Sequence, residues 1–116
     1  MRWKLLSWNV NGIRAAEKKG FAAWLGASGA EVVAVQETKA RPEQLSEALL
    51  RSPGYHAVWN SAEKKGYSGV GTYSKPQPLK VIAGLNDSRF DSEGRVLILE
   101  FEPFVFLNIY FPNGGR

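Results

Sequence analysis

Hydrophobic and polar positions in the first part of the chain follow the two-residue period of a β-strand. Residues 2–10 alternate polar and apolar side chains and become apolar at Trp8 and Val10, which predicts a strand that enters a core. The turn signal at residues 11–12 is expected to lead into a helix. Residues 32–35 carry no charge and are mostly β-branched, a pattern typical of a strand buried on both faces.

Helical spacing predicts a first helical region between these two strands. Phe21, Trp24 and Leu25 fall at positions i, i+3 and i+4, so they share one face of a helix. Gly20 is expected to divide the region into two short helical pieces.

A second helix is expected to begin at residues 41–44, where Pro42 suits the first helical position and Glu43 lies in the first turn. Its inward stripe is predicted to be Leu45, Ala48 and Leu49. The proline and glycine at residues 53–54 end it.

The remainder of the chain consists of short apolar or alternating runs separated by Gly, Pro, Asn and Asp, which predicts strands joined mostly by hairpins. These strands are expected at residues 55–60, 70–74, 79–83, 96–101 and 104–110. The order is β-α-β-α followed by a β meander, so we expect one α/β unit with a mixed sheet and flanking helices. No repeat or linker divides residues 1–116, which indicates a single domain.

Composition excludes several kinds of chemistry. The 116 residues are 44% hydrophobic, enough for a packed core, and the absence of cysteine excludes disulfides, thiolate metal sites and a cysteine nucleophile. No long apolar run predicts a signal peptide or membrane span, so a soluble, cytoplasmic protein with no membrane partner is expected. The net charge of +4 favours polyanionic partners, although a solvated surface is the simpler interpretation for any single lysine.

Two polar residues follow predicted strands, where α/β sheets bind ligands. Glu37 comes directly after the buried run and Gln36, and Asn9 ends the first strand. If the strands are neighbours, the Asn9 carbonyl oxygen and the Glu37 carboxylate converge into an incomplete shell of hard oxygens, which suits Mg²⁺, with Mn²⁺ as a substitute. The alternatives are a solvated or helix-capping acid for Glu37 and turn chemistry for Asn9 and Asn11.

Other candidates are weaker when taken singly. Asn113 follows a later strand and Tyr110 can supply a phenol at the same rim, although an aromatic strand end is the alternative for Tyr110. Tyr67, flanked by glycines, can place a ring or a backbone N–H near a phosphate, and a plain hairpin tip is the alternative. His56 is the single histidine and lies in an ordinary strand, so we interpret it as structural and expect no Ser-His-Asp site.

Five segments, in their order and spacing, resemble the exonuclease III family of apurinic/apyrimidinic endonucleases, part of the endonuclease/exonuclease/phosphatase superfamily. They are SWNVNG at 7–12, QETK at 36–39, GYSGV at 66–70, DSEGR at 91–95 and NIYFPN at 108–113. The resemblance covers residues 4–116 in one register. It implies a four-layered α/β sandwich of two packed sheets. It also implies hydrolysis 5′ to abasic sites in double-stranded DNA, with 3′-end exonuclease activity in many members.

The resemblance also implies roles for single residues. Asn9 and Glu37 correspond to residues of the family's Mg²⁺ site. Tyr110 corresponds to its active-site tyrosine and Asn113 to an active-site hydrogen-bonding residue. Catalytic roles are therefore expected for Glu37, Tyr110 and Asn113. DNA contact or support of the site is expected for Asn11, Arg14, Lys39, Tyr67, Arg95 and Arg116.

The chain departs from this family in length, since family domains are about twice as long. In them the second half supplies the groups that handle the nucleophile and the leaving group. We therefore expect residues 1–116 to be the N-terminal half of the sandwich, with the second sheet mostly missing and one apolar face of the first sheet exposed. A second chain or another copy is expected to complete the fold and the nuclease.

Two other functions stay open. One is a non-catalytic fragment that binds DNA or is merely folded. The other, a phosphatase relative that acts on small phosphoesters, is disfavoured by the segments typical of the abasic-site branch.

Overall fold

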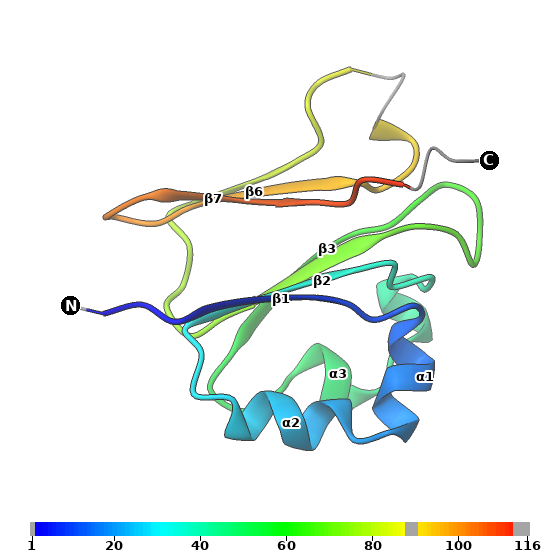
Figure 1. The fold of residues 1–116 in the computed structure, drawn as a ribbon. Coiled ribbons are helices and arrows are strands. Elements are labelled where there is room, and N and C mark those ends of the chain that lie inside the picture. The colour runs from blue at the N-terminus through cyan, green and yellow to red at the C-terminus, as the bar shows by residue number, and fades with distance from the viewer. Residues whose placement is uncertain (1, 88–90, 113–116) are drawn as a thin grey trace.

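Two β-sheets packed face to face form the centre of the molecule in this computed structural model, which describes residues 2–87 and 91–112 (Figure 1). The first sheet has the order β1 (Leu5–Asn9), β2 (Val32–Gln36), β4 (Val70–Ser74), β3 (His56–Asn60). The second has the order β5 (Lys80–Ala83), β6 (Val96–Glu100), β7 (Val105–Ile109). β1 and β2 are parallel and the other described pairs are antiparallel, so the first sheet is mixed, as predicted.

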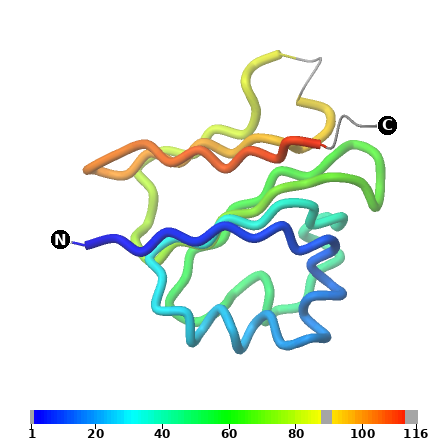
Figure 2. Tube along the Cα trace, in the orientation of Figure 1, coloured from blue at the N-terminus to red at the C-terminus, as the bar shows by residue number. Residues whose placement is uncertain are grey.

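Short helices cover the face of the first sheet that lies away from the second (Figures 1 and 2). They are α1 (Ile13–Lys18), α2 (Phe21–Ala27), the 3₁₀ turn η1 (Pro42–Gln44) and α3 (Glu47–Leu50). Their buried apolar residues join Val33, Val35 and Tyr73 in one core. Gly20 has a left-handed φ of 98° and separates α1 from α2, which confirms the predicted break. Among the described residues, no helix has the length and apolar character needed to cross a membrane.

The prediction of one continuous second helix is wrong, because the 3₁₀ turn η1 and the short helix α3 replace it. After η1 the backbone is extended at Leu45, and Ser46 then caps α3 by accepting a hydrogen bond from the Leu49 amide at 3.3 Å. Leu45 and Leu49 are buried as predicted, whereas Ala48 is exposed. Helical spacing does not hold across a break in the helix, so the predicted stripe fails at Ala48.

The expectation of a mostly missing second sheet is also wrong. The strands β5, β6 and β7 form a meander that covers the first sheet, and Val32 and Val70 pack with Leu97 and Leu99 in a second core. The uncovered apolar surface lies on the outer face of the second sheet instead. There Ile82, Ile98 and Leu107 are cross-strand neighbours, and Ile82 and Leu107 are 41% and 50% exposed.

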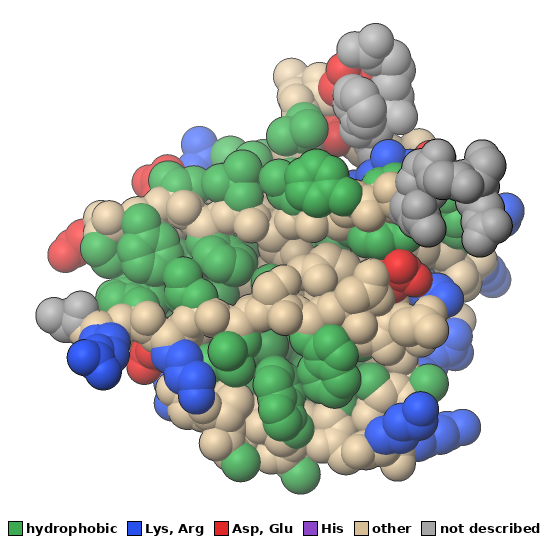
Figure 3. Space-filling view, in the orientation of Figure 1, with side chains coloured by type: hydrophobic (Ala, Val, Ile, Leu, Met, Phe, Trp, Pro, Cys, Tyr) green, Lys and Arg blue, Asp and Glu red, His purple; other side chains and the backbone are tan. Residues whose placement is uncertain are grey.

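β1 is one edge strand of the first sheet, and β7 is one edge strand of the second. These two edge strands lie on the same side of the molecule (Figures 1 and 2). A cavity of about 260 Å³ opens between the two edges and is lined by Ser7, Gln36 and Asn108 among others. On the face shown in Figure 3, hydrophobic side chains gather over the second sheet and between the two sheets. The side formed by β1 and β7 is therefore both unpaired and partly apolar within the described residues.

Candidate active site

Glu37 follows β2 at the end of the first sheet where β1 also ends. Asn9 and Gln36 are register partners, so their side chains lie on one face, toward the second sheet. Because side chains alternate between the two faces of a strand, a regular continuation of β2 would turn Glu37 away from the second sheet. Its left-handed φ of 55° ends the strand and turns the carboxylate back, so that Asn9 Nδ2 donates to Glu37 Oε2 at 2.9 Å.

Asn9, Asn11, Lys39 and Glu37 form a closed ring of polar contacts. Asn9 Oδ1 accepts a hydrogen bond from the Asn11 amide at 3.0 Å, and Asn11 Oδ1 accepts from Lys39 Nζ at 2.7 Å. The same ammonium lies 3.7 Å from Glu37 Oε1. The expected convergence of the Asn9 oxygen with the carboxylate is therefore not observed, because the amide presents its nitrogen to Glu37.

These contacts determine the charge state of the carboxyl group. The hydrogen bond from Asn9 lowers the pKa of Glu37, and the hydrogen bond from Tyr110 and the charge of Lys39 act in the same direction against partial burial. Burial first, and then the hydrogen bond to Glu37, raise the pKa of Tyr110. At neutral pH the pair consists of a carboxylate and a neutral phenol, whose O–H is available as a hydrogen-bond donor.

Tyr110 reaches this ring from the second sheet, just beyond the end of β7. Its backbone amide donates to the Arg95 carbonyl at 2.8 Å, which ties it to the start of β6. Arg95 is near enough for its positive charge to act on the phenol, and the Tyr67 phenol is a further neighbour of it. Lys64 Nζ lies 5.4 Å from the centre of the Tyr67 ring. Residues of both sheets and of the loop between β3 and β4 therefore meet at one end of the sandwich.

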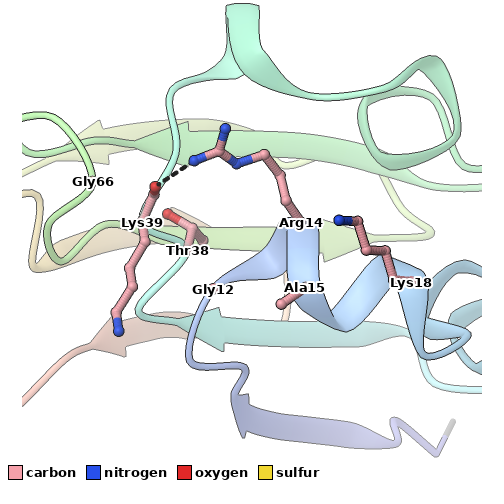
Figure 4. Close-up of a pocket in the computed structure, with 7 residues that line it drawn as sticks. All are labelled: Gly12, Arg14, Ala15, Lys18, Thr38, Lys39 and Gly66. Atoms are coloured by element: carbon pink, nitrogen blue, oxygen red, sulfur yellow. Dashed lines mark hydrogen bonds between the residues drawn. The ribbon is translucent and has the colours of Figure 1, made fainter.

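A basic pocket of about 480 Å³ opens beside the ring (Figure 4). Arg14 and Lys18 line it from α1, Lys39 lines it from the loop after β2, and Arg14 donates to the Lys39 carbonyl at 3.5 Å. The described lining residues are Gly12, Arg14, Ala15, Lys18, Thr38, Lys39 and Gly66. None of these is acidic, so the pocket suits a polyanion.

The donor set fits a hard divalent cation in part. Glu37 offers one carboxylate, 22% exposed, beside the amide of Asn9. Mg²⁺ takes one or two protein carboxylates and keeps several waters, so a sparse site of this kind is within its chemistry. Within residues 2–87 and 91–112, no group of three or more His, Cys, Asp or Glu side chains is gathered for a metal ion.

Most of the predicted site residues lie together at this end of the sandwich. The contacts described above connect eight of them: Asn9, Asn11, Arg14, Glu37, Lys39, Tyr67, Arg95 and Tyr110. Asn113 and Arg116 lie outside the described residues, so their roles stay predictions. The role of each connected residue in chemistry is likewise a prediction that geometry alone does not test.

The sequence pattern indicated that Lys18 could reach a phosphate, but it assigned no role to Gln36 or Asn108. Lys18 lines the basic pocket, and Gln36 hydrogen-bonds to Asn108 between the sheets. Asn108 left a usable signal, because it is a single polar residue at an inward position of the apolar run 104–110.

A profile of the Endonuclease/Exonuclease/phosphatase family matches residues 6–115. An exodeoxyribonuclease of Bacillus subtilis (strain 168) is 45% identical over 114 residues, which are 97% of this chain and 44% of that protein. The DNA repair nuclease APEX1 of Danio rerio is 38% identical over 115 residues, 97% of this chain and 37% of that protein.

Solved structures give the same result. An AP endonuclease from Archaeoglobus fulgidus superposes with a TM-score of 0.79 at 28% identity, over 94% of this chain and 41% of its own. The AP endonuclease LMAP from Leishmania major gives a TM-score of 0.73 at 29% identity, over 98% of this chain and 41% of its own. The chain spans less than half the length of these relatives.

Proposed function

The chain belongs to the endonuclease/exonuclease/phosphatase family, and we propose that it supplies half of the site of a Mg²⁺-dependent DNA repair nuclease. The reaction is hydrolysis of the phosphodiester 5′ to an abasic site in double-stranded DNA, with removal of nucleotides from 3′ ends as a second activity. One observation carries the proposal: the ring of Asn9, Glu37 and Lys39 lies between the phenol of Tyr110 and a basic pocket.

Each of these groups has a part in phosphodiester hydrolysis, which needs an oriented water and stabilised charge on the phosphoryl oxygens. Arg14 and Lys39 bind backbone phosphates, and the neutral phenol of Tyr110 donates a hydrogen bond to a phosphoryl oxygen. Glu37, ionised at neutral pH, would hold Mg²⁺, with the Asn9 amide beside it. The bound ion supplies Lewis-acid stabilisation of the developing negative charge.

The described residues leave one requirement unmet. The side chains that contact Glu37 are Asn9, Lys39 and Tyr110, and none of these is a base at neutral pH. We infer that a group that takes the proton from the attacking water comes from further polypeptide. We assign it to the part of the relatives that this chain does not match. That part, whether a further segment or a separate chain, is called the complementary polypeptide below.

The complementary polypeptide docks on the side where β1 and β7 are edges. Strand addition to both edges continues both sheets and satisfies their unpaired backbone groups. Leu107, on the outer face of β7, is 50% exposed, and Trp8 of β1, whose ring packs on Phe21 and Trp24 of α2, is 40% exposed, so apolar area borders each edge strand. A second copy of the chain is the competing occupant, and a size measurement on the pure chain distinguishes the two.

The test is nicking of a duplex that contains one abasic-site analogue, with Mg²⁺ and with EDTA. The chain is assayed alone and with the unmatched part of the Bacillus subtilis exodeoxyribonuclease. We expect Mg²⁺-dependent nicking in the mixture, reduced by about 100-fold or more in Glu37→Gln because one cooperating group is lost. Glu43→Gln, at an exposed position of η1, is the matched control and should keep full activity. Equal nicking by both variants would reject the role of Glu37.

The alternative, DNA binding without catalysis, is favoured by the basic pocket alone. It predicts that the affinity for an abasic duplex falls steeply with salt, and that Arg14→Ala lowers the slope of log K against log[salt] by about 1. Fluorescence anisotropy at several salt concentrations measures this slope. Arg51→Ala removes an exposed arginine just after α3 and should leave the slope unchanged. The same slope for all three proteins would contradict phosphate contact by Arg14.

A further inference from the structure

A buried amide lies between the two sheets. Asn108 of β7 is 1% exposed, and its side chain points at the first sheet. Its Nδ2 donates to the Gly71 carbonyl at 2.8 Å, to Thr72 Oγ1 at 3.1 Å and, more weakly, to the Val35 carbonyl at 3.3 Å. Asn108 therefore ties the second sheet to both central strands of the first.

A second amide, that of Gln36, extends these contacts into a hydrogen-bonded bridge between the two sheets. Gln36 Nε2 donates to Asn108 Oδ1 at 2.9 Å and to Ser7 Oγ at 3.0 Å. The bridge therefore links β7 to β2 and, through Ser7, to the edge strand β1. Both ends of the Asn108 amide and the nitrogen of the Gln36 amide have partners, so the cost of removing these groups from water is offset by directional hydrogen bonds.

Hydrogen bonds between the sheets fix their relative position, which apolar contacts alone do not. The surrounding residues Val32, Val70 and Leu99 hold the sheets together, but the hydrophobic effect has no direction and tolerates sliding of one sheet over the other. An amide that must meet fixed carbonyl groups near 2.9 Å permits a single register. The bridge therefore determines where β7 lies along β2.

That register reaches the candidate site within one or two residues. Gln36 directly precedes Glu37. Tyr110 lies two residues beyond Asn108, on the same face of the strand and about 7 Å further along it. The hydrogen-bonded pair Gln36 and Asn108 is thus the neighbour of the pair Glu37 and Tyr110, whose side chains are near enough for each to shift the pKa of the other.

We propose that Asn108 is a positioning residue of this site: by bridging β7 to β2 and β4 it fixes Tyr110 opposite Glu37. The consequence for reaction rate rests on the proposed nuclease function. The geometric statement does not, because it concerns two side chains of this chain alone. An Asn108 that served adhesion only would support the stability of the sandwich without affecting how Tyr110 and Glu37 interact.

The experiment is a double-mutant cycle repeated in several backgrounds. Urea unfolding of the wild-type chain, Tyr110→Phe, Glu37→Gln and the double variant gives the free energy of coupling between the two side chains. The cycle is then repeated with Asn108→Leu, which removes the bridge. We expect coupling in the wild type and its loss with Asn108→Leu.

Two further variants make the result decisive. Gln36→Leu removes the hydrogen bonds of Gln36 from the bridge and replaces Asn108→Leu in the experiment if that variant does not fold. The coupling free energy between Tyr110 and Glu37 should also fall in Gln36→Leu. Asn60→Ala is the matched control, because Asn60 Nδ2 also joins the sheets, donating to the Val96 carbonyl at 2.8 Å from the far edge strand β3. It should lower stability and leave the coupling intact.

The outcomes separate this inference from the proposed function. Coupling that survives removal of the bridge, or that is absent in the wild type, overturns the positioning role. Loss with Asn108→Leu or Gln36→Leu but not with Asn60→Ala supports it, even for a chain that never nicks DNA. In a complemented preparation that does nick, the Asn108 variant should lower kcat and leave KM unchanged.

Discussion

Asn11, Glu37 and Lys39 have φ values of 49°, 55° and 55°, in the left-handed region that residues other than glycine rarely adopt. Each such residue costs about 1 kcal/mol or more, so the local structure must impose the conformation. In each case the turn brings a polar side chain into the ring around Glu37. Strain of this kind, concentrated at one site, is what a preorganised binding site requires.

The lowered pKa of Glu37 predicts how stability depends on pH. Because the folded-state pKa lies below the usual value of 4.5, the carboxylate stabilises the fold above about pH 4.5, and this contribution is lost as the pH falls through the folded-state pKa. Urea unfolding of the wild type and Glu37→Gln should differ most at neutral pH, by no more than about 1 kcal/mol for a partly exposed group. The difference should shrink below pH 4.5. A difference that is independent of pH would contradict the contacts described.

The loops after β2 and before β4 are held together as one unit. Thr38 donates its amide to the Gly69 carbonyl at 3.1 Å, and Lys39 donates to the Ser68 carbonyl at 2.8 Å. A Cβ at Gly69 would lie 2.3 Å from Thr38 Oγ1, so the close approach depends on glycine. This pairing places Tyr67 beside the end of β2.

A pair of glycine variants tests this arrangement of elements. Gly69→Ala should destabilise the chain by about 2 kcal/mol or more, because φ is +92° and the new methyl group meets Thr38. Gly66→Ala, with φ +71° and no atom within 4 Å of the new methyl group, should cost only about 1 kcal/mol. Thermal and urea unfolding measure both. Equal losses for the two variants would show that the contact with Thr38 carries no cost.

At the scale of the whole molecule, the described residues form three layers: helices, the first sheet and the second sheet (Figure 1). The outer face of the second sheet carries exposed apolar residues, among them Ile82 and Leu107, and the edge strand β1 carries Trp8. Soluble monomers rarely leave such surface open, and open strand edges favour association. The surface is therefore where a complementary polypeptide gains most.

Leu107→Gln tests this surface. The residue is 50% exposed, so the substitution should change the stability of the isolated chain by less than about 0.5 kcal/mol. Affinity for the complementary polypeptide should fall about tenfold, or about 1.4 kcal/mol, because an apolar contact is replaced by an amide. Calorimetric titration measures the affinity, with Ala48→Gln on the exposed side of α3 as the control. Unchanged affinity for Leu107→Gln would place the docking surface elsewhere.

Local patterns predicted most of the elements and the residue types of the candidate site. The strand at residues 70–74 and the helix break at Gly20 are confirmed, and Glu37 was recognised by its place after a buried strand. The exposure of Ala48 was not predictable, because it depends on a side-chain cap that restarts the helix at Ser46. The direction of the Asn9 amide was not predictable either, because it depends on the partners that folding brings to each end of the group.

The sequence by itself therefore determined where the strands and the first two helices lie, since hydrophobic period and turn residues act between near neighbours in the chain. Only the tertiary structure decided that the last three strands cover the first sheet and that Glu37 turns toward Asn9. It also decided that Gln36 meets Asn108 across 72 positions. A local pattern shows that a face is apolar or that a residue is polar. Which distant face or residue it meets depends on packing of the whole chain, because only there are burial and hydrogen bonding satisfied together.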